Sequence, residues 1–378
     1  MPTSSSAALE SALASAPKYD VWVWSQVDAG VEPELSNTYR QFRSPDAAEP
    51  LTLSTVISPL EPLAVIAERT TPWMSWHTTA GRVGALLVRD DEGAAFVVSS
   101  WPDSRPGIYH LAATVPATDR RWQRFGRWLM HAAPRVMPVY LDRGDFEGFV
   151  SVLGEHGEVD ASRLTGRYRT DQSSYSRGWP NPKSARAALE EVADEVQLRT
   201  MTLSVLSAAQ PEILLRVHLR RSAGATFYSG DFELFRSVVL ERLAAAANRR
   251  VQLFRNRART PEQPTPRPIE IRVGRARFDE ASAAGDFIER ITRYAASDTA
   301  VLHRNPYMQV ALTDYLDGSN FDVFVTSVDK ITVFPGYRAS VSALVRLTDF
   351  LSEEFEADGV ADVATTRPAE IEDLFAPG

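Results

Sequence analysis

Residues 307–356 read YMQVALTDYLDGSNFDVFVTSVDKITVFPGYRASVSALVRLTDFLSEEFE. Met308, Val310 and Leu312 alternate with polar or small residues, which is the period of two typical of a strand with one buried face. The pair Asp317-Gly318 offers the positive φ that a tight hairpin turn requires. The segment therefore predicts an antiparallel meander, with strands at residues 307–315, 321–326 and 331–334.

A helix is expected to follow this meander from about residue 340. Apolar residues recur there at i, i+3 and i+4 spacing, as on a helix with one buried stripe. Ser340 is the expected N-cap, and Gly359 the expected residue just beyond the C-terminus. Strands followed by a helix recur loosely at residues 82–133 and 196–247. We therefore predict an α+β fold, in which antiparallel sheets are each covered on one face by helices.

A short internal similarity raises the question of duplication. Gly144-Asp145-Phe146-Glu147 is echoed by Gly230-Asp231-Phe232-Glu233. In both segments the glycine breaks the chain and the aspartate is expected to cap a helix. Helix starts often look alike, so two interpretations stay open: coincidence, or two related halves of common ancestry.

The local composition, together with the positions of Gly and Pro, suggests how the chain is divided into domains. Residues 160–186 mix arginines and aromatic residues with Gly, Ser, Asn and Pro and show no periodicity, which is typical of a linker. The expected parts are a disordered lead (1–18), an N-terminal α+β domain (19–159), this basic and aromatic linker (160–186), a C-terminal α+β domain (187–360) and a tail (361–378).

The overall composition excludes several classes of function. The 378 residues contain no cysteine, so disulfides, Cys-ligated zinc, iron–sulfur clusters and thiol catalysis are excluded. No apolar run is long enough to span a membrane, and the N-terminus lacks the features of a signal peptide, so we expect a cytoplasmic protein without a membrane partner. The net charge of −8 counts against a general nucleic-acid or membrane-surface protein.

No motif in the chain indicates catalysis or cofactor binding. Phosphate-binding loops, a dinucleotide-binding Gly motif, a nucleophile elbow and a His-Glu-x-x-His motif are all absent from the sequence. The six histidines never pair at the spacing of metal ligands. We therefore predict no catalytic, cofactor-binding or metal-binding residue, although a site assembled from dispersed residues would escape this reasoning.

Two arginine-bearing segments are the candidates for binding. Arginine interleaved with tyrosine and tryptophan suits phosphate contacts combined with base stacking. The candidate contacts to an anion or nucleic acid are Arg163, Arg167, Tyr168, Arg169, Arg177, Trp179, Arg255, Arg257 and Arg259. A predicted strand at residues 213–220 also places His218 on its polar face with Arg216 and Arg220.

Three non-catalytic functions compete on these grounds, beside an enzyme whose site is assembled from dispersed residues. The absence of catalytic motifs and the aromatic-rich strands favour a non-catalytic interaction or assembly protein, which binds another protein or a second copy of itself. The arginine-bearing segments favour a nucleic-acid-binding protein. A helix laid over a curved sheet favours a module that binds a small ligand in a cavity.

Overall fold

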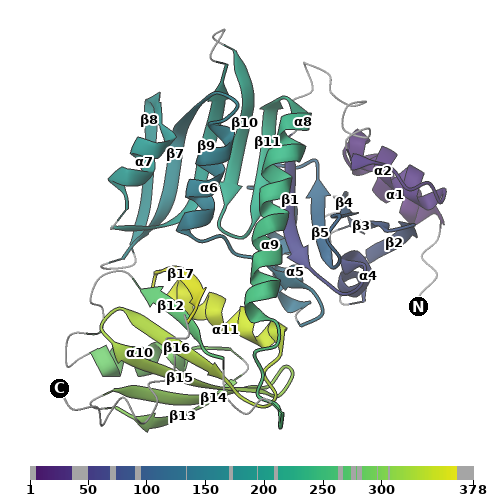
Figure 1. The fold of residues 1–378 in the computed structure, drawn as a ribbon. Coiled ribbons are helices and arrows are strands. Elements are labelled where there is room, and N and C mark those ends of the chain that lie inside the picture. The colour runs from purple at the N-terminus through teal and green to yellow at the C-terminus, as the bar shows by residue number, and fades with distance from the viewer. Residues whose placement is uncertain are drawn as a thin grey trace, which may run out of the picture. The chain divides into compact units, whose positions relative to one another are not determined.

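The computed structural model describes residues 6–35, 50–68, 74–89, 95–132, 134–169, 173–193, 195–207, 212–262, 267–273, 278, 283–295, 297–304 and 307–363. The chain divides into two compact units, unit 1 at residues 1–252 and unit 2 at residues 253–378. Each unit contains one antiparallel sheet with helices, so the predicted α+β class is confirmed (Figure 1).

Unit 1 is built on an eleven-stranded antiparallel sheet. Its strands are β1 (Leu51–Ile57), β2 (Met74–Ala80), β3 (Val83–Arg89), β4 (Ala95–Pro102), β5 (Ile108–Ala113), β6 (Met137–Pro138), β7 (Glu158–Tyr168), β8 (Ser174–Ser184), β9 (Val196–Leu206), β10 (Ile213–Arg220) and β11 (Gly224–Gly230). The order is β2-β3-β4-β5-β1-β11-β10-β9-β7-β8, and β6 pairs with β1.

The helices of unit 1 are spread along the chain. They are α1 (Ser6–Ser15), α2 (Lys18–Asp28), α4 (Pro62–Ala67), α5 (Arg120–His131), α6 (Arg143–Leu153), α7 (Ala185–Glu191), the short α8 (Phe232–Leu234), the π-helix η1 (Phe235–Leu240) and α9 (Glu241–Phe254). The last of these continues across the division between the units at residue 252.

Burial patterns explain how these helices are placed on the sheet. Strands β3 and β4 are buried along nearly their whole length, as expected of strands covered on both faces. One buried cluster joins them to α1, α2, α6, α7 and α9, and a second joins them to α4 and α5. We call the face covered by the first cluster the helix face of the sheet.

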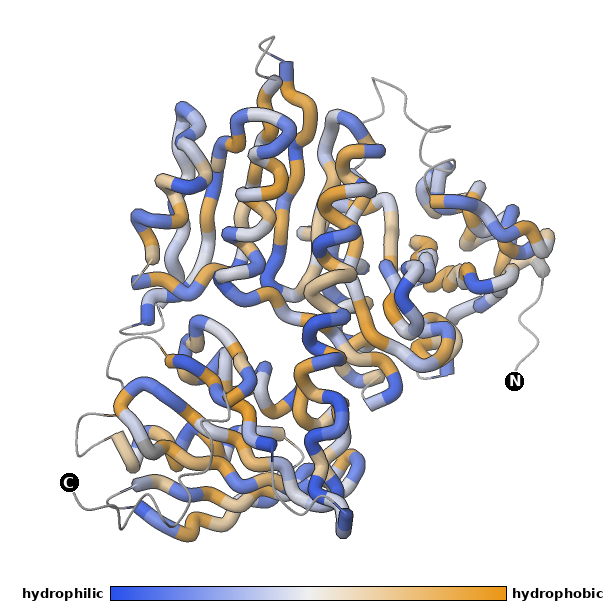
Figure 2. Tube along the Cα trace, in the orientation of Figure 1, coloured by the Kyte–Doolittle hydropathy of each residue, from blue (hydrophilic) through white to orange (hydrophobic). Residues whose placement is uncertain are grey.

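The strands β7, β9, β10 and β11 have a different pattern. Along β10, Leu215, Val217 and Leu219 are buried on the helix face, whereas Arg216, His218 and Arg220 lie on the opposite face and are more exposed. The alternation of apolar and polar residues is visible along these strands in Figure 2. We call the side of β7, β9, β10 and β11 that carries His218 the polar face.

The two sides of the β1–β11 pairing do not repeat one strand order. Counted outward from this pair, one side runs β1-β5-β4-β3-β2 and the other β11-β10-β9-β7-β8. The similarity around Asp145 and Asp231 is also not equivalent, because Asp231 is an N-cap whereas the N-cap of α6 is Asp142. The idea of two related halves gains no support from these elements.

Unit 2 contains a six-stranded antiparallel sheet in the order β13-β14-β15-β16-β12-β17. Its elements are β12 (Ile269–Val273), α10 (Ala283–Ile291), β13 (Ser297–His303), β14 (Met308–Asp314), β15 (Ser319–Ser327), β16 (Lys330–Pro335), α11 (Val341–Glu354) and β17 (Ala357–Asp362). Side chains from both helices and from the strands form one buried cluster.

The predicted meander and helix at residues 307–356 are confirmed in unit 2. Asp314 pairs with Ser319 across the β14–β15 turn, and Gly318 has a φ of 74°, as the Asp-Gly turn requires. Ser340 caps α11, since its hydroxyl accepts a hydrogen bond from the Ala343 amide at 3.0 Å. Gly359, in contrast, lies inside β17, because the helix ends at Phe355 and the chain returns to the sheet.

The predicted limits of the parts need correction. The expected linker at residues 160–186 contains β7 and β8, which belong to the large sheet, and the chain divides at residue 252 instead. The expected lead contains α1, and part of the expected tail, Ala361 and Asp362, belongs to β17. Residues 1–5 and 364–378 lie outside the described residues.

No helix among the described residues is both long enough and apolar enough to cross a bilayer.

Candidate functional site

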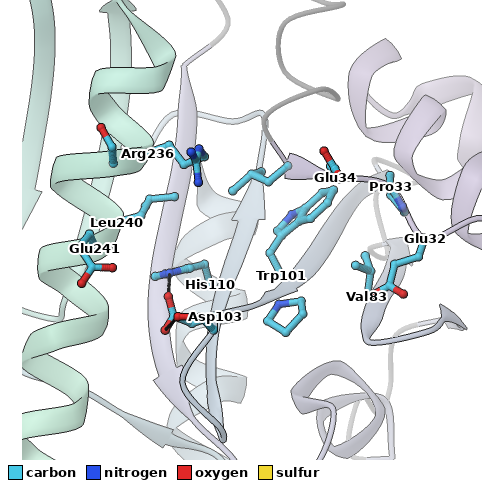
Figure 3. Close-up of a pocket in the computed structure, with 14 residues that line it drawn as sticks. Glu32, Pro33, Glu34, Val83, Trp101, Asp103, His110, Arg236, Leu240 and Glu241 are labelled. Carbon is cyan, nitrogen blue, oxygen red and sulfur yellow. Dashed lines mark hydrogen bonds and ion pairs between the residues drawn. The ribbon is translucent and has the colours of Figure 1, made fainter.

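A pocket of about 830 Å³ opens on the helix face of unit 1 (Figure 3). Strands β3, β4 and β5 supply its floor, residues 32–35 one wall, and η1 with the start of α9 the other. The lining residues are Glu32, Pro33, Glu34, Leu35, Val83, Trp101, Pro102, Asp103, Ser104, His110, Arg236, Ser237, Leu240 and Glu241.

Two neighbouring aromatic side chains form the floor of the pocket. Trp101 and His110 are paired across β4 and β5, so both point to the helix face. The Trp101 indole donates a hydrogen bond of 2.7 Å to Ser99. Their exposed fractions are only 3% and 4%, so each shows one edge to the pocket and is held by the core behind it.

The His110 ring is held from both sides. Its Nδ1 lies 3.1 Å from the Thr55 hydroxyl, which comes from the adjacent strand β1. Its Nε2 lies 3.8 Å from an oxygen of Asp103, the contact drawn in Figure 3. A ring fixed in this way keeps one orientation when a ligand enters the pocket.

Asp103 is an ionised carboxylate at the end of β4. It accepts hydrogen bonds from the Arg105 amide at 2.9 Å and from the Arg105 guanidinium at 3.0 Å. Burial raises the pKa of Asp103, but the nearby His110 imidazole and the hydrogen bonds from Arg105 outweigh burial and hold this pKa well below its usual range. The floor therefore carries a fixed negative charge beside the imidazole.

The second wall depends on an irregular helix. The Asp231 side chain caps its start by accepting from the Glu233 amide at 2.8 Å. The chain then widens into the π-helix η1, a form that is rare and is often found at functional sites. Arg236, Ser237 and Leu240 come from this π-helix, and Arg236 and Leu240 face the pocket in Figure 3.

Aromatic packing fixes the π-helix to the sheet. The ring of Phe235 lies 5.2 Å from that of Phe227 on β11 and 5.8 Å from that of Phe232. Phe235 is fully buried. The wall of the pocket is therefore anchored in the same core as the floor.

The lining carries more negative than positive charge. Among the described lining residues, the carboxylates are Glu32, Glu34, Asp103 and Glu241, and the guanidinium is that of Arg236. Arg105 bridges Asp103 to Glu241, and Arg236 pairs with Glu233, so both cations are partly neutralised. The charge balance favours a ligand with a positive or hydrogen-bond-donating group.

A second polar cluster, around Glu61, has a structural role. Glu61 caps α4 through the amides of Leu63 and Ala64, and also binds His77 at 2.9 Å. The Ser100 hydroxyl donates to this carboxylate, and Ser100 is buried. This serine therefore lacks both the histidine contact and the access that a nucleophile requires.

The arginine and aromatic residues that were predicted between residues 163 and 179 lie on two opposite faces of the β7–β8 hairpin. Tyr168 and Trp179 pack on the helix-face cluster, and Arg177 pairs there with Glu191 of α7. Arg163 and Arg167 alternate with the buried Leu164 and so lie on the polar face. The backbone amide of Arg169, just after β7, donates to the Glu195 carbonyl.

The other predicted contacts, Arg255, Arg257 and Arg259, belong to unit 2. Arg257 is buried, and its guanidinium binds the Leu253 carbonyl at 2.6 Å and the Asp362 carboxylate at 2.8 Å. The Arg259 amide donates to the Gly336 carbonyl. Arg257 therefore closes a turn of unit 2, and these three arginines belong to a different unit from the predicted contacts at residues 163–179.

The pocket residues were not predicted from the sequence. Asp103, His110 and Ser237, together with Thr55 behind the floor, come from separate segments, and none belongs to a local motif. The one signal in this region is the capping aspartate Asp231, which the sequence does predict, but it says nothing about the π-helix that follows. Within the described residues, no three histidine or acidic side chains converge to hold a metal ion.

The charge on Asp103 leads to a prediction about pH. Because its pKa is lowered in the folded state, its stabilising effect is present above the ordinary value of 3.8 and is lost as the pH falls below it. Asp103→Asn should lower the free energy of unfolding at pH 7 by about 1–3 kcal/mol, since the half-buried donors of Arg105 lose a charged acceptor. Denaturant titrations at pH 7 and at about pH 3 measure the difference in the free energy of unfolding between the parent protein and this variant. We expect this difference to be smaller at the lower pH.

Asp28→Asn is the matched control, because Asp28 is exposed at the end of α2. This variant should differ little from the parent protein at either pH. A difference for Asp103→Asn that widens on acidification would contradict the assignment of a lowered pKa.

A scan against models of known protein families and a search of curated proteins found no match to this chain.

Proposed function

We propose that unit 1 binds a small, positively charged ligand in the pocket on its helix face. The observation that carries this proposal is the pocket itself, of about 830 Å³, with a fixed His110–Asp103 pair on its floor. Its volume is in the range of sites for small molecules, and a few convergent polar groups beside an aromatic surface are typical of such sites.

The lining supports a particular kind of ligand. The exposed edge of the Trp101 indole offers a small apolar surface against which an aliphatic or aromatic group can pack. The carboxylates of Glu32 and Glu34 line one wall, where they can attract an ammonium or guanidinium group, and Glu241 on the opposite wall is shared with Arg105. An anionic ligand would meet mostly like charge, so it is disfavoured.

The proposal is tested by closing the pocket. Ser237→Trp places an indole on the π-helix wall and should weaken binding at least about tenfold, since the ligand and the indole compete for one volume. The probes are 2-phenylethylamine, 2-phenylethanol and 3-phenylpropionate, which share a ring and differ in charge. Calorimetric titration of the full chain should rank the amine first and the carboxylate last.

Ser25→Trp is the matched control. Ser25 is an exposed helical serine whose hydroxyl binds a carbonyl one turn earlier, as that of Ser237 does. The control should bind the amine like the parent protein. Tighter binding of the carboxylate would overturn the charge assignment, and equal binding of the amine by Ser237→Trp and the parent would overturn the pocket.

The other expectations from the sequence stay predictions. Association with a protein partner or a second copy, nucleic-acid binding and a cytoplasmic location have no observation of their own among the described residues. The pocket therefore favours the small-ligand hypothesis over them.

A further inference from the structure

The polar face of unit 1 carries a cross-strand row of hydrogen-bonding side chains. Arg163 on β7 pairs with Thr202 on β9, which pairs with His218 on β10, which pairs with Thr226 on β11. Adjacent strands are about 4.8 Å apart, so Arg163 and His218 start about 10 Å apart on one face. The Thr202 hydroxyl lies between them and bonds to His218 Nδ1 at 2.9 Å.

Two positive charges of this face, those of Arg220 and Arg163, have neutral partners. Arg220 lies two residues after His218 on β10, and it donates to the Thr226 hydroxyl at 2.7 Å and to the Leu53 carbonyl at 2.6 Å. Arg163 donates to the Ser176 hydroxyl at 3.2 Å. In the described part of the chain, no carboxylate forms an ion pair with either guanidinium. Cations held this way attract an anion from solution.

The pKa of His218 responds to the positive charges of these arginines. Burial lowers its pKa, and the neighbouring Arg220 and Arg163 lower it further, to about 4. The imidazole is therefore neutral at pH 7, with its Nδ1 bonded to Thr202. An anion that neutralised these charges would reverse the part of the shift that the arginines cause.

The other titratable groups near His218 on this face are few. Asp160 on β7 stands one row beyond Arg163, opposite Ser204. Arg216 on β10 lies over the ring of Tyr228 on β11, with its guanidinium carbon 5.8 Å from the ring centroid. Among the described residues, the face thus carries the four arginines Arg163, Arg167, Arg216 and Arg220 against the carboxylates of Glu158 and Asp160, and its balance is opposite to that of the pocket.

We propose that the polar face binds the phosphate group of a ligand, held by Arg163, His218 and the Thr202 hydroxyl. Arg163 is exposed, so its guanidinium can turn from the Ser176 hydroxyl and offer two parallel donors to a tetrahedral oxyanion. Arg220 contributes long-range attraction from behind the row. This site is distinct from the pocket, which lies on the other face of the sheet.

Inorganic phosphate and sulfate are the probes, with sodium chloride at equal ionic strength as the reference. Proton–carbon NMR of the histidine rings in the full chain follows His218 between pH 4 and pH 7 with sulfate, which keeps its charge over this range. The pKa of His218 should rise with sulfate and stay at its starting value with chloride. At pH 7, phosphate should shift the amides of Arg163, Thr202 and His218 saturably.

Arg163→Met should weaken phosphate binding about tenfold or more, the loss expected for one charge-assisted hydrogen bond. Arg177→Met is the matched control, because Arg177 is an exposed arginine of the same hairpin that faces α7. Equal weakening by both variants, or an unchanged pKa of His218 in saturating sulfate, would overturn the site. Ser237→Trp should leave phosphate binding intact, which separates this test from that of the pocket.

Discussion

Replacing Asp314 with alanine should lower the free energy of unfolding of unit 2 by about 3–5 kcal/mol, because it removes the closest carboxylate of the half-buried Arg346 guanidinium and the acceptor of the buried Tyr294 hydroxyl. Asp314 is 1% exposed. One of its oxygens accepts hydrogen bonds from Arg346 at 2.7 Å and from the Tyr294 hydroxyl at 2.9 Å. Burial, together with the Asp314 charge, raises the pKa of Tyr294 above its usual range, so this hydroxyl stays a donor.

Hydrogen exchange of the amides in β14, β15 and β16 is the suitable measurement for this variant. The eight tryptophans all precede residue 180, so tryptophan fluorescence reports on unit 1 and not on unit 2. The control is Asp329→Ala, at the exposed turn before β16, where a loss below about 0.5 kcal/mol is expected. Equal exchange in Asp314→Ala and this control would show that the buried network contributes nothing to stability.

Replacing Phe235 with alanine should destabilise unit 1 by about 3–5 kcal/mol through the cavity it leaves. Phe235 is fully buried against Phe227 and Phe232, beneath the π-helix. Because the π-helix forms one wall of the pocket, its altered packing should also weaken binding of 2-phenylethylamine. Guanidinium titration followed by tryptophan fluorescence measures the stability, and calorimetry measures the binding.

Tyr228→Ala is the control for Phe235→Ala, since Tyr228 lies on the same sheet but is 42% exposed. It should cost less than about 1 kcal/mol and leave amine binding unchanged. If Phe235→Ala were as stable as this control, the aromatic cluster could not be the anchor of the wall.

Local sequence patterns predicted those parts of the fold that are determined by residues close together in the chain. The Asp317-Gly318 turn and the Ser340 cap act within a few residues, and both are present. Strand β10 has the predicted bounds because its alternation reflects one buried face. These features require no knowledge of distant partners.

Features that depend on distant contacts were not predicted. Residues 19–27 are rich in tryptophan and valine, which favours a strand, yet they form α2 because Val23, Trp24 and Val27 meet the core on one helical face. Strand β8 lacks periodicity because it is an edge strand with little to bury. The register between strands brings His110 close to Thr55 and Asp103, and this register could not be predicted from local sequence patterns.

The end of the large sheet at β8 has a consequence for how copies of this protein meet. The outer strand carries Pro180 and Pro182, which have no amide hydrogen to offer to an incoming strand. Free sheet edges are the usual starting points of fibrils, and proline is one of the residues that block them. The hairpin that was predicted as a linker therefore ends the sheet in an edge that is a poor template for a further strand.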